Sequence, residues 1–139
     1  MDVENKNADE FASSGSWLSD TFRQFNFVAL MRERNHIRRT CAESMRVYRR
    51  FKSEMPDAAP KEFYARMIEK RTGAGAAGVS EIMRRIEESF TTWPVEREIT
   101  LRDVVSFFAV TDCLNADPTA AGVRSRVRDV VANAIPPDL

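Results

Sequence analysis

Hydrophobic positions after residue 19 recur along the chain in alternating steps of three and four. The positions that follow this rule are Phe27, Leu30, Arg34, Ile37, Cys41, Ser44, Tyr48, Phe51 and Met55, and all but the arginine and the serine are apolar, cysteine or tyrosine. An a/d pattern held over about four heptads predicts one long helix of about thirty-five residues, or two helices nearly in line. Ser19 or Asp20 can cap its start. Pro56 ends it, because the residue before a proline is driven out of helical geometry.

Two shorter helices are predicted next. Pro60 is a favoured first-turn residue and Gly73 a favoured stop, so a second helix spans the segment between them. A third helix has its apolar residues at helical spacing and closes near Trp93 and Pro94. Its apolar residues are Val79, Ile82, Met83, Ile86 and Phe90.

Two further helices complete the pattern. Thr100 and Asp103 form a variant capping box for a fourth helix, whose apolar residues surround most of its circumference and so place it in the middle of the fold. These residues are Leu101, Val104, Val105, Phe107, Phe108, Val110 and Leu114. Asp117 and Pro118 predict the N-cap and first turn of a fifth helix, which stops at Pro136. One face of that helix carries Val123, Val127, Val130 and Val131.

No segment outside these helices shows the strict alternation of a half-buried strand over more than a few residues. The sequence therefore predicts an all-α protein, a small helical bundle of about five helices with one long N-terminal helix. Residues 1–16 are acidic and polar with few apolar positions, which predicts a flexible tail. Residues 17–139 are expected to form a single helical domain.

Composition adds little that is specific to one function. The 139 residues carry 21 basic and 21 acidic side chains, so no net charge draws the chain toward nucleic acid or a membrane surface. No apolar run approaches the ~20 residues that span a bilayer. The first ten residues have no apolar signal-peptide core. Cys41 and Cys113 lack metal or redox spacing and are expected to be core residues in a reducing compartment, so a cytoplasmic location is predicted.

Gly73, Gly75 and Gly78 follow the spacing G-x-G-x-x-G that binds dinucleotides. That function requires a strand before the loop, whereas the preceding residues are helical and highly charged. The favoured interpretation is that Gly73 ends one helix in left-handed geometry and small residues lead to the next. A helix-turn-helix around residues 77–88 is a weaker alternative, because its first helix would have to include two of the glycines.

Residues typical of metal sites and catalysis occur without the partners they need. Glu33 and His36 form one E-x-x-H motif, but His36 is the only histidine and several arginines surround it. Cys41 has no second histidine to act as a base. The acidic residues Glu69, Glu81, Glu87 and Glu88 are interpreted as solvent-facing residues of amphipathic helices. The sequence thus predicts no metal, no cofactor and no catalytic residue, and a protein that is not an enzyme.

Basic residues are concentrated between positions 32 and 52. Arg32, Arg39, Arg46 and Arg50 fall within about 40° of one another at about 100° per residue, a face that could bind phosphates. The alternative is that Glu43 bridges Arg39 and Arg46 and that the other arginines pair with acidic segments. A lesser cluster is formed by Arg124, Arg126 and Arg128.

Three hypotheses about function follow. The first is a non-enzymatic protein-interaction or regulatory module that associates with itself as a dimer, or with another protein. Its candidate association seam comprises Leu30, Ile37, Tyr48 and Phe51. The second is binding of nucleic acid or an anionic surface by the arginine-rich helix face. The third is a small-molecule pocket between helices, lined by Phe and Met.

Overall fold

The computed structural model describes residues 2–90 and 98–139, with side chains from Asn26 onward. Within these ranges the chain forms five α-helices and no strand. The helices are α1 (Asp2–Glu54), α2 (Pro60–Thr72), α3 (Ala76–Phe90), α4 (Leu101–Ala116) and α5 (Val123–Ala134). The all-α prediction and the order of the elements are confirmed. The expected end of the third helix at Trp93 and Pro94 lies outside the described residues.

The chain divides into two compact units, Met1–Glu33 and Arg34–Leu139, and their boundary falls within α1. Because α1 begins at Asp2, it includes the segment that the sequence assigned to a tail. Residues 2–16 contain no proline and one glycine, so nothing in their covalent structure ends a helix there. The division of the chain at residue 16 stays a prediction.

In the unit Arg34–Leu139, one face of α1 forms part of the core. Ile37 and Cys41 are fully buried, and Ser44, Tyr48 and Phe51 follow at helical spacing on the same side. Tyr48 packs edge-on against Phe63 of α2, with ring centroids 5.5 Å apart, and stacks on Tyr64 at 6.1 Å. Each such aromatic pair contributes about 0.5–1.5 kcal/mol beyond the area it buries. The a/d residues of this stretch are therefore used to attach α1 to α2.

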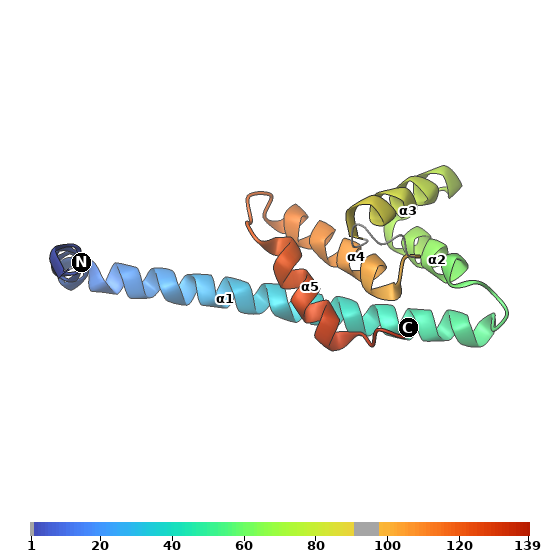
Figure 1. Cartoon of the computed structure of the whole chain (residues 1–139), viewed down its shortest axis with the longest axis horizontal. Coiled ribbons are helices and arrows are strands. Elements are labelled where there is room, and N and C mark those ends of the chain that lie inside the picture. Colours follow the sequence, from blue (N-terminus) through green and yellow to red (C-terminus); the bar gives the residue numbers. More distant parts are fainter. Residues whose placement is uncertain (1, 91–97) are drawn as a thin grey trace. The chain divides into compact units, whose positions relative to one another are not determined.

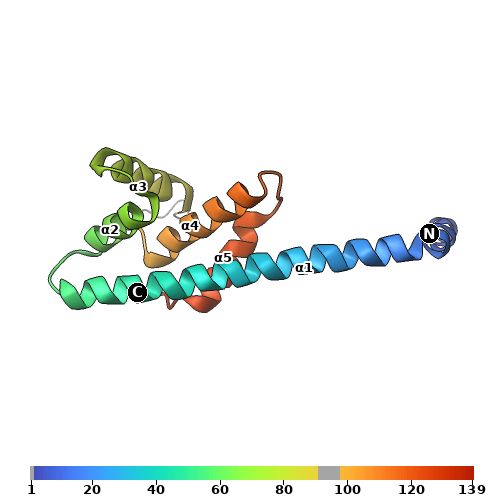
Figure 2. The ribbon, with the colours of Figure 1, turned by 180° about the vertical axis from the view of Figure 1, so that it is seen from behind.

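Helix α4 is the central helix of the same unit, as its sequence predicts. It lies between α3 and α5 (Figures 1 and 2) and packs against both. Leu101, Val104 and Val105 are fully buried, and Phe108 is nearly so. The predicted capping box is present: the Thr100 backbone N–H donates to the Asp103 carboxylate at 2.8 Å, and the Thr100 hydroxyl accepts from the Asp103 N–H.

Of two helix ends predicted from the sequence, one is confirmed and the other is wrong. Gly73 caps α2 with φ of 70°, and its N–H donates to the carbonyl of Glu69, as predicted. The fifth helix, in contrast, begins at Val123 after Gly122, and the prediction that Asp117 is its N-cap is wrong. The Asp117 carboxylate instead accepts from the N–H and hydroxyl of Thr119, two residues on. Such a local turn competes with helix initiation for the same acceptor.

Candidate functional site

The four residues predicted to form an association seam do not share one exposed surface. Ile37, Tyr48 and Phe51 are 0%, 5% and 8% exposed, because other helices of the same chain cover them. Leu30, in the unit Met1–Glu33, is 46% exposed. The expectation of a single seam is corrected accordingly: of these four residues, Leu30 alone is open to a second chain in the structure.

Leu30 belongs to a short apolar segment of α1 that faces solvent. Phe27 is 64% exposed, Val28 45% and Met31 41%, all in the unit Met1–Glu33. We call these four residues the apolar segment. Leu114 on α4, at 37%, is the other large exposed hydrophobic side chain in the described part of the chain. Adjacent apolar residues at this exposure are typical of an interaction surface, whereas a single one is ordinary.

The predicted arginines of α1 are all exposed. Arg32 lies in the unit Met1–Glu33, and Arg39, Arg46 and Arg50 in the unit Arg34–Leu139, where Arg38 and Arg49 lie on the same outer side of the helix. We call the set Arg38, Arg39, Arg46, Arg49 and Arg50 the arginine face.

Few of these arginines have a partner. Arg50 lies 3.8 Å from Glu54 and packs over the ring of Phe51. Among the described residues, Arg39 and Arg46 form no hydrogen bond or ion pair, so the expected bridge through Glu43 is not formed. The positive charges of Arg39 and Arg46 are therefore not neutralised by an ion pair with a described residue of their own helix.

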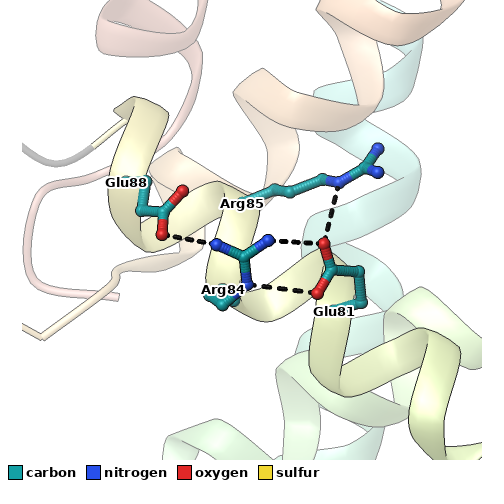
Figure 3. Close-up of polar contacts among 4 residues, drawn as sticks. All are labelled: Glu81, Arg84, Arg85 and Glu88. Atoms are coloured by element: carbon teal, nitrogen blue, oxygen red, sulfur yellow. Dashed lines mark hydrogen bonds and ion pairs between the residues drawn. The ribbon is translucent and has the colours of Figure 1, made fainter.

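Helix α3 shows the opposite arrangement. Arg84 donates to both Glu81 and Glu88, with N–O distances of 2.6 Å, and Arg85 lies 3.4 Å from Glu81 (Figure 3). Hydrogen bonding from Arg84 lowers the pKa of Glu81, and the same contacts raise the pKa of Arg84. The interpretation of Glu81 and Glu88 as surface residues of an amphipathic helix is confirmed. Their charges cancel within α3.

His36 takes part in a contact that joins three helices. Its Nε2 lies 2.9 Å from Oδ2 of Asp112 on α4, and Arg71 of α2 donates to the same oxygen. The Arg71 guanidinium also packs over the ring of Phe108, 5.0 Å from its centroid. No sequence pattern linked these residues, because 76 positions separate His36 from Asp112. In the part of the chain that the structure describes, no group of three metal-ligating residues assembles around Glu33 and His36.

The glycine loop lies between two helices. Gly73 is the left-handed cap of α2, and Gly78 lies inside α3, where a Cβ would meet that of Ala74 at 2.9 Å. No strand precedes the loop within residues 2–90, so the geometry of a dinucleotide turn is missing. Val79 and Ser80 are helical as well, so the turn that the helix-turn-helix alternative places at residues 77–80 is not there, and the chain turns at residues 73–75 instead.

Neither Cys41 nor Cys113 forms a disulfide and both are buried, as the sequence predicts. Burial raises the pKa of the Cys41 thiol to about 11. A thiol with that pKa stays protonated at neutral pH, and a protonated thiol is a poor nucleophile. Cys41 is thus part of the core.

Comparisons with known proteins assign no function. The sequence matches no family model, and no similar protein is found among curated proteins or solved structures. None of the helices, over the residues described, is both long and apolar enough to cross a membrane. The function is therefore inferred from the surface residues of the chain itself.

Proposed function

We propose that this chain is a non-enzymatic protein-interaction module of the cytoplasm that associates with a second copy of itself through the apolar segment of α1. The observation that carries this proposal is the exposure of Phe27, Val28, Leu30 and Met31, which ranges from 41% to 64%. Covering such side chains removes apolar area from water and is favourable by about 25 cal/mol per Å². A two-fold contact covers the segment of both copies at once.

The charge pattern on either side of the apolar segment favours a second copy in antiparallel orientation. Residues 1–20 carry five acidic side chains and one basic, whereas residues 32–52 carry eight basic and two acidic. In an antiparallel pair, the acidic stretch of each copy runs beside the basic stretch of the other. Parallel pairing places like charges together, which is unfavourable.

Sedimentation velocity over a range of protein concentration tests this proposal. We expect a monomer–dimer equilibrium that Leu30→Glu shifts to monomer, because a carboxylate in the contact must be desolvated. Leu114→Glu is the matched control, since it makes the same change at an exposed leucine of α4. A wild-type chain that stays monomeric at all concentrations, or equal effects of both variants, contradicts the proposal.

Orientation is tested by a spin label on Arg46→Cys, a site distant in sequence from the apolar segment. Antiparallel pairing keeps the two labels of a dimer far apart, whereas parallel pairing brings equal positions together. A short label-to-label distance therefore rules out the antiparallel arrangement. Cys41 and Cys113 are buried and do not compete for the label.

A second candidate function is binding of nucleic acid or an anionic surface by the arginine face. The observation that favours it is the absence of partners for Arg39 and Arg46 within the described residues. Such binding weakens as salt rises, because each neutralised phosphate releases a counterion. We expect Arg39→Glu with Arg46→Glu to abolish binding to a mixed-sequence duplex. Arg84→Glu with Arg85→Glu, on the neutralised surface of α3, is the charge-matched control.

A further inference from the structure

The unit Arg34–Leu139 contains a cavity between the end of α3, the start of α4 and one face of α5. Its volume is about 720 Å³, which is within the usual range of small-molecule sites. Among the described residues of its lining are three arginines, Arg102, Arg124 and Arg128, and one acidic residue, Asp103. The cavity walls therefore carry an excess of positive charge.

The arginines of the cavity differ in how their donors are used. Arg102 donates to the carbonyls of Ile135 and Ala132 at 2.7 and 2.9 Å, and so ties α4 to the end of α5. Arg124 lies over the ring of Phe90 with its guanidinium carbon 4.8 Å from the centroid, a contact with the face of the group that leaves its in-plane N–H donors free. Within the described residues, Arg124 and Arg128 have no hydrogen bond or ion pair.

Asp103, the acidic residue of the lining, forms part of the capping box of α4. Its side chain is 5% exposed, and its Oδ2 accepts from both the backbone N–H and the hydroxyl of Thr100. The carboxylate thus stabilises the first turn of α4. Arg124 and Arg128, four residues apart, lie on the same face of α5 one turn from each other.

The rest of the cavity lining includes both hydroxyl groups and apolar side chains. Ser106 of α4 and Ser125 of α5 are hydrogen-bond donors, whereas Phe90 and Val131 are apolar. Paired guanidinium groups with nearby hydroxyls match the oxygens of a phosphate. A bare phosphate fills only a small part of the cavity volume. A ligand that fills the cavity therefore also has an apolar part, which covers the apolar side chains of the lining.

We propose that this cavity binds a small organic phosphate, with the phosphate held by Arg124 and Arg128 and the apolar or aromatic remainder against Phe90. The site differs from the pocket lined by Phe and Met that the sequence left open, since the described residues of its lining include one Phe and no Met. It also differs in position from the apolar segment and from the arginine face, both of which lie on α1.

Calorimetric titration of the full chain with phenyl phosphate tests this proposal. We expect saturable binding of phenyl phosphate, weaker binding of inorganic phosphate, and none of phenol, because the charged group supplies most of the affinity. Arg124→Gln and Arg128→Gln are each expected to weaken binding by about tenfold, which corresponds to about 1.4 kcal/mol. Arg39→Gln removes the same charge from α1 and is expected to leave the affinity unchanged.

A second variant tests the cavity without altering charge. Ala132 is an exposed residue of the lining, and Ala132→Phe fills the space that the apolar part of the ligand needs. This variant is expected to weaken the binding of phenyl phosphate more than the binding of inorganic phosphate. The proposal is overturned if phenyl phosphate shows no saturable binding to the wild-type chain. It is also overturned if Arg39→Gln lowers the affinity for phenyl phosphate as much as Arg124→Gln and Arg128→Gln do.

Discussion

His36 on α1 and Asp112 on α4 face each other with Nε2 and Oδ2 2.9 Å apart, although 76 residues separate them in sequence. Arg71 of α2 donates to the same carboxylate oxygen, so one side chain connects three helices. The side chains of Arg71 and Asp112 are 28% and 29% exposed, and that of His36 is 42% exposed. Solvent therefore screens this contact in part, and its contribution to stability is that of a half-buried ion pair.

Asp112→Asn removes the charge of the shared carboxylate and keeps its shape. We expect the free energy of unfolding to fall by about 1 kcal/mol, since a half-buried charged contact lies between exposed and buried pairs in strength. Urea unfolding at neutral pH measures this change. Asp57→Asn, at an exposed position in the turn after α1, is the control and should leave stability unchanged. Equal stabilities of all three chains would show that the contact contributes nothing.

The stability of the protein is expected to fall at alkaline pH. The pKa of Cys41 rises from 9.0 to about 11 on folding because burial disfavours the thiolate. Between these values the unfolded chain has lost a proton that the folded chain retains, so the free energy of unfolding decreases as pH rises. The loss amounts to at most about 3 kcal/mol for this group, since each pKa unit corresponds to about 1.4 kcal/mol. Tyr64, whose pKa burial raises from 10.0 to about 12, acts in the same direction at higher pH.

Urea unfolding from about pH 8 to about pH 11 measures this dependence. Cys41→Ala should make the decline shallower in that range, whatever its effect on stability at neutral pH. The slope is the relevant quantity, because removal of a buried side chain also lowers stability at every pH. An unchanged slope in this variant would contradict the assignment to Cys41.

Gly73→Ala is expected to destabilise the chain by about 1 kcal/mol, because its φ of 70° is unfavourable for a residue with a side chain. Gly75→Ala is the matched control two residues away. It has no atom within 4 Å of the added Cβ and no positive φ, so it should be neutral or slightly stabilising. Thermal unfolding of both variants separates the effect of backbone geometry from that of added bulk.

Ile37→Ala and Leu30→Ala distinguish core from surface along α1. Ile37 is fully buried, so its truncation should lower the free energy of unfolding by about 2–5 kcal/mol. Leu30 is 46% exposed, and Leu30→Ala should change the stability of the monomer by less than about 1 kcal/mol. Chemical unfolding at a concentration below that of dimer formation provides the comparison. Similar losses in both variants would show that Leu30 is covered within the chain.

Local signals in the sequence predicted most helix ends. The start at Pro60, the stop at Gly73 and the Thr100–Asp103 capping box each depend on residues within one turn of the end they define. Where two local structures competed for one residue, the prediction was wrong: Asp117 forms a turn with Thr119, and the fifth helix begins five residues after Pro118. The Asp117 carboxylate accepts hydrogen bonds both as a helix N-cap and in a turn with Thr119, and the sequence pattern does not show which of the two is more stable.

The fold class could be predicted from the amino-acid sequence, because helical periodicity and helix-end chemistry act over a few residues and need no partner. Which a/d residues of α1 belong to the core depends on tertiary packing, since an a/d pattern is the same whether a helix of this chain or a second chain covers it. The tertiary structure alone paired Arg71 with Asp112, because side chains distant in sequence meet only after folding. It also brought Arg124, Arg128 and Phe90 to one cavity, where residues from two helices share a wall that no single segment contains.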